Sequence, residues 1–354
     1  WKLVNVLLKK FFFCISGIVF LLLLLFFWKG YSKKNPYSSR ESYALGTLIR
    51  IQAQGENAPQ ALEMALQRIA KIEDHMSLHS SSSDIAFVNQ KAGIEPVVVH
   101  NDTFFVMEQA LKYAQKSSGY FDPTIGPIVD LWGIGTNKEK LPTEKEITQR
   151  LPLVNYAHSV INKETQSIML LQKGQMLDLG GIAKGYAADE VAQIFRGKGI
   201  KSALIDLGGN IYAYGTKADG TLWNIGIQDP LEPRGTPLGI VKVSNCSVVT
   251  SGNYERFFEV GGKRYHHIFD PHSGYPAESG LLSATIVSQT SIDGDALSTT
   301  LYILGKEEGL AFIERIPGVE ALVVTEEKKI YATSGMSKIF RLIKGKGYIY
   351  EEGK

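Results

Sequence analysis

The stretch LDLGGIAKGYAADE, residues 177–190, joins a strand-like segment to a helical pattern through two adjacent glycines. Gly180 and Gly181 carry no side chain, so the backbone there can approach a ligand closely. The helix expected over 182–197 would offer unpaired N–H groups and a positive dipole end to an anion. Lys184 in its first turn opposes that dipole unless an anion is held there. The stretch therefore indicates either a phosphate site or a plain strand–turn–helix connection.

This glycine pair fits neither of the two common nucleotide-binding fingerprints. The order of residues 180–185, GGIAKG, differs from G-x-G-x-x-G and from G-x-x-x-x-G-K-[ST]. A second Asp-Leu-Gly-Gly corner follows at residues 206–209, after a strand expected over 202–207. Two such corners at the ends of successive strands either line one cleft or serve tight packing of the sheet.

Outward from these corners, strand and helix patterns alternate in groups. Short alternating segments dominate from about residue 155, and a strand is expected over 42–54. Helical patterns occupy 58–75, 102–117, 293–304 and 306–316, and Phe105 is expected to point inward from the second of these. Strands joined by hairpin-length turns, with helices grouped between them, predict the α+β class: largely antiparallel sheets flanked by helices in a single domain with two lobes.

The N-terminal part differs from the rest in composition. Phe11 to Trp28 is a run of 18 apolar or small residues without a charge, about the length that crosses a bilayer. Lysines flank the run and a tryptophan ends it, whereas a cleaved signal peptide has a shorter apolar stretch followed by small residues. We therefore expect an uncleaved anchor over a cleaved signal. The expected division is anchor or signal segment 1–34, linker 35–41 and folded domain 42–354.

Charge and cysteine content exclude several classes of site. Residues 1–34 hold six lysines and no acid, and the remainder has 32 basic against 36 acidic residues, a net charge of −4. Overall charge thus gives no support to a nucleic-acid surface. Cys246 is the only cysteine outside the apolar run, so the domain forms no internal disulfide and no cysteine zinc site.

A histidine-rich region follows at residues 250–276, with TSGNYERF and then GGKRYHHIFDPHSGYP. His266 and His267 alternate across an expected strand, so only one of them can face a given cleft. A facing histidine is the usual general base for a hydroxyl nucleophile. An ordinary core or surface histidine, or a zinc site formed by three histidines, are the other interpretations.

The segment SIDGDALSTTLYILG, residues 291–305, carries oxygen-bearing side chains on an expected helix. Asp295 and Thr299 are four residues apart and share one helix face. A small set of oxygen ligands suits Mg²⁺, which completes its shell with water and substrate phosphate. The alternative is that Asp293 or Asp295 caps the helix.

These motifs, in this order and spacing, resemble the ApbE-type FAD:protein FMN transferase family. The resemblance covers residues 42–345 and rests on LDLGGIAKGYAADEV, LIDLGG, TSGNYERF, HHIFDPHSGYP and DGDALSTTLYILG. MSLHSSSSDIAFVN and GYFDPTIGPIVDLWGIG fit the N-terminal half of the family more weakly. The second of these, rich in glycine, proline and aromatic residues, would otherwise be either a packed loop or a binding wall.

The resemblance implies an enzyme that binds FAD, uses Mg²⁺ to polarise its pyrophosphate, and transfers FMN to a threonine or serine of an acceptor protein while releasing AMP. The acceptors of such enzymes are exported or membrane flavoprotein subunits of respiratory electron transfer. Together with the expected anchor, this implies a catalytic domain on the outer side of the cell membrane.

The resemblance also implies roles for individual residues. The metal would be held by Asp295, Thr299 and the backbone carbonyl of Ala183, and His267 would deprotonate the acceptor hydroxyl. The flavin nucleotide would meet Asp178, Lys184, Tyr120, Phe121, Asp122 and the backbone of Gly180 and Gly181, between apolar walls from Leu45 and Ile268. At His79, where many relatives would carry an aromatic such as tyrosine, an imidazole would stack near the flavin.

Two other functions are compatible with the same motifs. An FAD pyrophosphatase would use the same metal and base with water as the acceptor, giving free FMN and AMP. A non-catalytic flavin-binding protein would hold the nucleotide without cutting it, and would need no metal. A lipoprotein would need a lipobox at Cys14, and the bulky phenylalanines before that residue do not form one.

Overall fold

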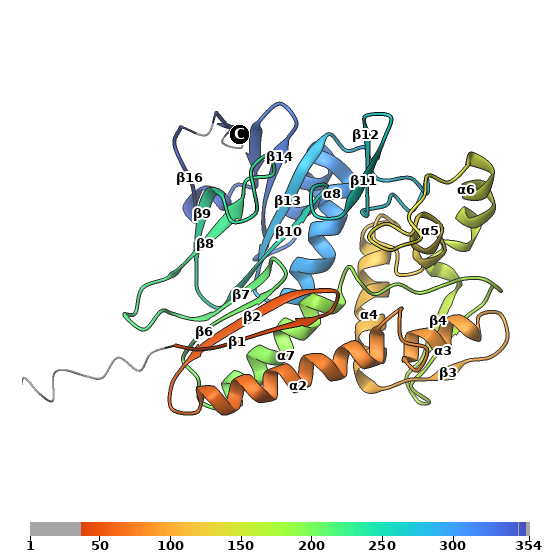
Figure 1. The fold of residues 1–354 in the computed structure, drawn as a ribbon, viewed down its shortest axis with the longest axis horizontal. Coiled ribbons are helices and arrows are strands. Elements are labelled where there is room, and N and C mark those ends of the chain that lie inside the picture. Colours follow the sequence, from red (N-terminus) through yellow and green to blue (C-terminus); the bar gives the residue numbers. More distant parts are fainter. Residues whose placement is uncertain (1–36, 346, 352–354) are drawn as a thin grey trace, which may run out of the picture. The chain divides into compact units, whose positions relative to one another are not determined.

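A nine-stranded sheet forms the centre of the computed structural model, which describes residues 37–345 and 347–351 (Figure 1). Its strand order is β1-β2-β6-β7-β10-β13-β14-β15-β17. Every neighbouring pair in this sheet is antiparallel except β15–β17. The strands are β1 (Ser38–Ala44), β2 (Thr47–Gln54), β6 (Ser202–Leu207), β7 (Asn210–Gly215), β10 (Cys246–Gly252), β13 (Leu281–Ser288), β14 (Glu320–Thr325), β15 (Lys329–Ala332) and β17 (Ile349–Glu351).

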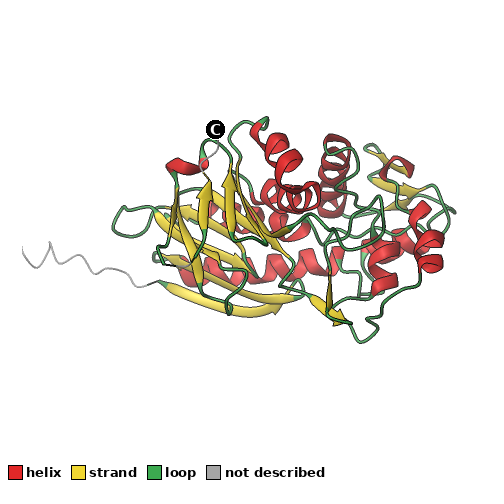
Figure 2. Ribbon diagram, turned by 90° about the horizontal axis from the view of Figure 1, so that it is seen from above, coloured by secondary structure: helices red, strands yellow, loops and turns green. Residues whose placement is uncertain are grey.

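Three helices cover one face of this sheet: α2 (Ala58–Met76), α7 (Ala183–Gly197) and α8 (Ser291–Glu314). In α2, Leu62, Ala65, Ile69 and Ile72 recur at helical spacing and are fully buried, which gives the helix one apolar side. Together with Ile49 and Ile51 of β2 they form the larger core. Figure 2 shows these helices in red beside the strands in yellow.

A second sheet packs on the opposite face. It consists of β8 (Trp223–Gln228), β9 (Pro237–Val243) and β16 (Phe340–Leu342) in the order β16-β9-β8. Along β14, Val323 points into the helix-covered core, while Leu322 and Val324 point into the core under the second sheet. Successive side chains of a strand point to opposite faces, so the uninterrupted apolar run of β14 reflects burial on both sides.

The remaining elements lie toward one end of the large sheet (Figure 1). Five short helical elements and one longer helix belong here: α3 (Asp84–Gln90), α4 (Asn101–Lys116), α5 (Gly126–Trp132), α6 (Glu144–Arg150) and the 3₁₀ turns Leu151–Leu153 and Tyr156–His158. A small sheet has the order β3-β5-β4, and a two-stranded sheet is formed by β11 and β12. Their bounds are β3 (Val97–Val98), β4 (Ser159–Asn162), β5 (Ser167–Leu170), β11 (Phe257–Val260) and β12 (Lys263–His266).

The α+β class with mostly antiparallel sheets is confirmed, and three local predictions need correction. The strand expected over 42–54 is a hairpin, turned by Leu45 (φ 54°) and Gly46 (φ 68°), and β1 extends into the stretch expected to be a linker. Phe105, expected to point inward from α4, is exposed. The loop expected over 117–135 contains the short helix α5.

The two helices expected on either side of residue 305 are present as one element that breaks at Gly305 (φ 79°, ψ −172°). Among the described residues, no helix combines the length and apolarity needed to cross a bilayer. The expected anchor or signal segment, residues 1–34, lies outside the described residues.

Candidate active site

The turn before α7 is held by hydrogen bonds of its own. The carboxylate of Asp178 accepts the Gly180 N–H at Oδ1 over 2.7 Å. The N–H groups of Ile182 and Ala183 both donate to the carbonyl of Leu179. The N–H of Gly180, expected to meet a phosphate, is therefore already engaged, and the turn is fixed before any ligand arrives.

Gly181 is the point where three distant parts of the chain meet. A Cβ atom built at Gly181 would lie 3.3 Å from the Phe121 ring and 3.6 Å from Oγ1 of Thr299. The glycine corner, the glycine-proline loop and α8 thus converge here. The absence of a side chain leaves room between the ring and the hydroxyl.

The start of α7 packs directly on the start of α8. The Gly185 N–H donates to Oδ2 of Asp295 over 2.9 Å, and a Cβ at Gly185 would lie only 2.3 Å from the Ser291 carbonyl oxygen. Asp295 is 4% exposed. One oxygen of this buried carboxylate is fixed by backbone, and its second oxygen, Oδ1, lies near the Lys184 ammonium.

A carboxylate from another helix caps α8. Asp189 of α7 accepts the N–H of Ser291 at Oδ1 over 2.7 Å and that of Ile292 at Oδ2 over 2.9 Å. Burial raises the pKa of Asp189 to about 7, and the nearby charge of Asp293 adds to the effect. Asp293 accepts a hydrogen bond from the hydroxyl of Tyr113. Neither Asp293 nor Asp295 caps its own helix, so the capping interpretation is wrong.

The oxygen atoms expected to hold a metal form a consistent set. Oδ1 of Asp295 is 3.4 Å from the Lys184 ammonium, and Oγ1 of Thr299 lies 3.4 Å from the Asp295 carbonyl, a long contact that leaves the hydroxyl available. Ala183 is the first residue of α7 and is buried. A carboxylate, a hydroxyl and a backbone carbonyl are hard oxygen donors, the chemistry that Mg²⁺ prefers.

Lys184 lies beside Asp295, one of these expected metal ligands. Its ammonium donates to the carbonyl of Gly180 over 2.9 Å in addition to its ion pair with Asp295. Its charge acts on two other site residues as well. Burial raises the pKa of Asp178, and Lys184 is the largest of the cations that oppose this rise. Lys184 also contributes to the lowered pKa of His267.

The two neighbouring histidines have different environments. His266 is buried, its Nε2–H donates to the Ala277 carbonyl over 3.2 Å, and its Nδ1 accepts the Ile268 N–H. His267 is half-buried, and its Nδ1 lies 3.2 Å from the carbonyl oxygen of Arg256. Since a carbonyl oxygen only accepts, Nδ1 carries the proton, and Nε2 is left as the basic nitrogen.

Arg256 is a site residue to which the sequence analysis gave no role. Its backbone carbonyl holds His267, and its guanidinium donates to the Gly46 carbonyl over 3.1 Å. Burial lowers the pKa of His267 to about 3, and the Arg256 cation is the next largest cause. An arginine inside the TSGNYERF motif was visible in the sequence, but its contact with the β1–β2 turn was not.

The glycine-proline loop contributes unequally to the site. Phe121 is buried and faces Gly181. Tyr120 packs its ring on His272, with centroids 4.6 Å apart. Asp122 is buried, and its carboxylate accepts hydrogen bonds from Thr124 and from the Tyr156 N–H. These contacts stabilise the shape of the loop. Burial raises the pKa of Asp122.

Three further residues were expected to contact the flavin nucleotide: His79, Ile268 and Leu45. His79 is exposed, and its imidazole acts electrostatically on Asp178. Ile268 is buried next to His267. Leu45 forms the β1–β2 turn that Arg256 contacts, and its N–H donates to the Glu73 carboxylate over 2.9 Å.

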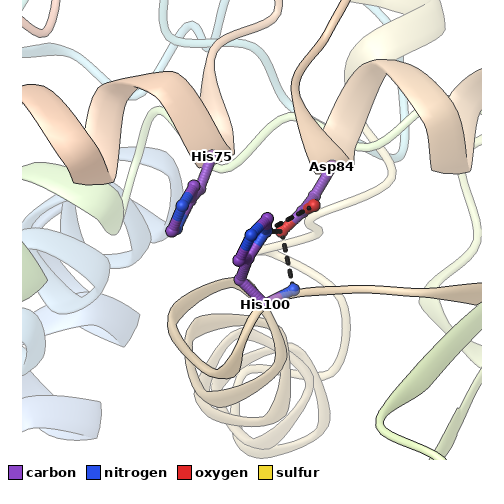
Figure 3. Close-up of side chains that lie close together, drawn as sticks. All are labelled: His75, Asp84 and His100. Carbon is purple, nitrogen blue, oxygen red and sulfur yellow. Dashed lines mark hydrogen bonds and ion pairs between the residues drawn. The ribbon is translucent and has the colours of Figure 1, made fainter.

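A separate cluster joins the ends of three helices (Figure 3). The cluster consists of His75, Asp84 and His100. Among the described residues, it is the one group of three histidine, cysteine or acidic side chains whose ligand atoms lie close enough together to hold one metal ion. The two imidazole rings stack, with centroids 3.8 Å apart and planes 10° apart. Both oxygens of Asp84 accept hydrogen bonds, from His100 and from Thr103.

This stacked geometry does not suit a metal ion. A ring nitrogen binds metal in the plane of its ring, and the lone pairs of two parallel rings do not converge on one point. Hard Mg²⁺ also prefers oxygen over imidazole nitrogen. The cluster instead ties the end of α2 to the starts of α3 and α4, and the oxygen set at Asp295 remains the better place for the expected metal.

Comparison with known proteins agrees with these motifs. The ApbE family matches residues 45–323. The FAD:protein FMN transferase of Treponema pallidum (strain Nichols) is 37% identical over 322 residues, covering 86% of this chain and 89% of that protein. The FAD:protein FMN transferase of Klebsiella pneumoniae (strain 342) is 38% identical over 268 residues, covering 76% and 83%.

Solved structures give the same result. The crystal structure of the ApbE protein from Thermotoga maritima superimposes with a TM-score of 0.81 at 31% identity, covering 86% of this chain and 100% of that one. The flavin transferase ApbE from Vibrio cholerae gives a TM-score of 0.76 at 26% identity, covering 86% and 100%. By sequence and by fold, the chain therefore belongs to the ApbE family and is a transferase.

Proposed function

We propose that this transferase moves the FMN part of FAD onto a threonine or serine hydroxyl of an acceptor protein, with release of AMP and with Mg²⁺ at Asp295 and Thr299. The observation that carries the proposal is the position of Lys184. Its ammonium pairs with Asp295, and its charge acts on both Asp178 and His267. One cation thus connects the expected metal ligand, nucleotide contact and base.

The base would be Nε2 of His267. The Arg256 carbonyl holds Nδ1–H and so fixes the ring and its tautomer. A pKa lowered to about 3 keeps the imidazole neutral at physiological pH, able to accept a proton. The pyrophosphate of bound FAD carries negative charge, and this charge would raise the pKa of His267 toward the range where a general base is most effective.

Asp295, Thr299 and the carbonyl of Ala183 would hold the metal. Bound there, Mg²⁺ would neutralise charge on the pyrophosphate and on the departing phosphate oxygen. Lys184 would place its ammonium against the pyrophosphate, and Asp178 would order the turn that faces the nucleotide. Phe121 would supply an apolar wall against the flavin nucleotide.

The reaction balances without an oxidant or reductant. The acceptor hydroxyl gives its proton to His267, and its oxygen forms a bond to the phosphorus of the FMN half. The P–O bond to the AMP half breaks, and its electron pair leaves on the AMP phosphate. In-line displacement needs alignment of the two oxygens, which a rigid turn at residues 178–183 would help to provide.

A mass measurement tests this function. The full chain is incubated with FAD, Mg²⁺ and a candidate acceptor flavoprotein, and the acceptor is weighed while AMP is quantified. A gain of one FMN unit per acceptor with equal AMP supports the transferase. AMP with free FMN and an unchanged acceptor indicates a pyrophosphatase that uses water, and bound FAD without AMP contradicts both enzymes.

Two variants and one control locate the chemistry. His267→Ala should lose transfer and retain FAD binding, and persisting transfer would show that His267 is not the base. His100→Ala removes an exposed imidazole from the stacked cluster and should keep wild-type transfer. Asp295→Asn should lose activity together with metal binding.

We also propose that the enzyme acts at the outer side of the cell membrane on exported or membrane-bound flavoprotein subunits. The support is the uncharged run from Phe11 to Trp28 with its flanking lysines. Protease treatment of intact and lysed cells, followed by detection of the domain, tests this location. If the domain is protected from protease in cells whose outer envelope is permeabilised but whose inner membrane is intact, the proposed location is wrong.

A further inference from the structure

A buried carboxylate in this site depends on a lysine for its charge balance. Asp295 is 4% exposed, and its Oδ2 accepts a hydrogen bond from the Gly185 N–H. An ionised carboxylate without a compensating cation is costly to bury. Among the described residues, the cation in ion-pair contact with Asp295 is Lys184, 3.4 Å from Oδ1.

The lysine is held loosely in this position. A separation of 3.4 Å exceeds the usual length of a charged N–H···O hydrogen bond, so the contact with Asp295 is an ion pair without a tight hydrogen bond. One hydrogen bond of 2.9 Å, to the Gly180 carbonyl, anchors the ammonium, and Gly180 is itself exposed. The lysine side chain is 27% exposed and has a flexible four-carbon stem. The ammonium can therefore leave without disturbing the packed helices.

The same carboxylate oxygen is the one that a metal would use. Oδ2 of Asp295 is committed to backbone, which leaves Oδ1 for a cation. A divalent ion at Oδ1 and Thr299 would lie within a few ångströms of the present ammonium position, and two cations at such a distance repel each other. Metal and ammonium therefore compete for one place.

Resting on the proposed function, we propose that Lys184 is a placeholder cation that couples metal binding to pyrophosphate binding. Without ligands, its ammonium neutralises Asp295 and opposes metal binding. When the metal binds, the ammonium is displaced, and the pyrophosphate of the nucleotide is the anion that receives it. Each ligand thus favours the other, and the free enzyme binds metal weakly.

Linkage gives this proposal a measurable form. If ADP strengthens Mn²⁺ binding by some factor, Mn²⁺ must strengthen ADP binding by the same factor. Some coupling comes from direct contact between metal and phosphate. The part of the coupling that depends on Lys184 is the difference in coupling factor between the wild type and a variant that lacks the ammonium.

The experiment measures Mn²⁺ dissociation constants by electron paramagnetic resonance of free Mn²⁺, with and without ADP as a pyrophosphate that is not transferred. The full chain is compared with Lys184→Met, which keeps the length of the stem, and with Lys184→Arg, which keeps the charge. Lys198→Met removes a partly exposed lysine just after the same helix and is the matched control.

Lys184→Met should bind Mn²⁺ alone about tenfold more tightly than the wild type, and its ADP coupling factor should fall about tenfold, within the usual range of coupling. Lys184→Arg should retain most of the coupling, and Lys198→Met all of it. Unchanged or weaker Mn²⁺ binding by Lys184→Met, with full coupling, overturns the placeholder role while leaving the proposed function intact. Failure of the wild type to bind Mn²⁺, or indifference of binding to Asp295→Asn, contradicts the metal site itself.

Discussion

The backbone N–H of Gly185 donates a 2.9 Å hydrogen bond to the carboxylate of Asp295, 110 residues further along the chain. This bond joins the first turn of α7 to the first turns of α8 and orients the carboxylate. It exists because Gly185 has no side chain, since a Cβ there would lie 2.3 Å from the Ser291 carbonyl oxygen and 2.6 Å from Cα of Ile292. The close approach of two helices thus places the Asp295 carboxylate against the first turn of α7.

Gly185→Ala should separate these helices. Overpacking of this kind costs about 1–3 kcal/mol of unfolding free energy, and the Asp295 carboxylate should lose its orientation and part of its Mn²⁺ affinity. Urea denaturation and Mn²⁺ binding measure the two effects. Gly197→Ala at the end of the same helix has no neighbouring atom within 4 Å of the new Cβ and should leave both quantities nearly unchanged. Equal behaviour of the two variants would contradict the packing argument.

Thr299→Val tests whether the hydroxyl contributes to metal binding. Valine has the shape of threonine without the oxygen, so Mn²⁺ affinity should fall roughly tenfold or more if a ligand is lost. Thr299→Ser keeps the hydroxyl and should keep most of the affinity. Thr300→Val serves as control, because that hydroxyl donates to the Ala296 carbonyl inside the helix. Normal Mn²⁺ binding by Thr299→Val would remove Thr299 from the ligand set.

The pH dependence of catalysis should reveal how substrate changes His267. Burial and then the Arg256 cation lower the pKa of His267 to about 3 in the free enzyme. The acid limb of kcat/KM, which reports the free enzyme, should therefore lie at lower pH than the acid limb of kcat, which reports the complex with FAD. Arg256→Gln removes a cation beside the base and should shift the kcat/KM limb to higher pH. Coincident limbs in the wild type would mean that bound pyrophosphate does not affect the base.

Stability should fall at acidic pH partly through His266. Burial lowers its pKa to about 4, below its ordinary value of about 6.5. Its contribution is therefore fully present above pH 6.5 and is lost as the pH falls toward 4, because the unfolded chain then binds a proton that the folded chain does not. The loss in unfolding free energy should be on the order of 1–3 kcal/mol for this group.

His266→Gln keeps a donor and an acceptor without a titrating ring, so its unfolding free energy should decline less between pH 7 and pH 4.5 than that of the wild type. The exposed His79→Gln variant is the matched control and should decline like the wild type. Denaturant titrations at a series of pH values provide the comparison. Parallel declines of His266→Gln and wild type would show that the acid sensitivity arises elsewhere.

Local patterns were enough to predict much of the fold. The stripe in α2, the alternation in β6 and the break at Gly305 depend on residues close together in the chain, because side-chain direction repeats every 3.6 or every 2 residues. The hairpin at Leu45 and Gly46 was missed because a positive φ at leucine is rare, and a single glycine inside an alternating pattern is only a weak turn signal.

The sequence by itself determined the α+β class, the order of the motifs and the kinds of atoms available: glycine corners, a histidine pair, and an aspartate and a threonine one helical turn apart. Only the tertiary structure decided which of these atoms meet. Asp189, not Asp293 or Asp295, caps α8; Arg256 holds His267; and Lys184 pairs with Asp295. The contacts of Asp189 and Lys184 with α8 join residues more than 100 positions apart, and the Arg256–His267 contact, 11 residues apart, depends on the register of the β11–β12 hairpin. Helix packing and strand register decide these contacts, and no local periodicity specifies them.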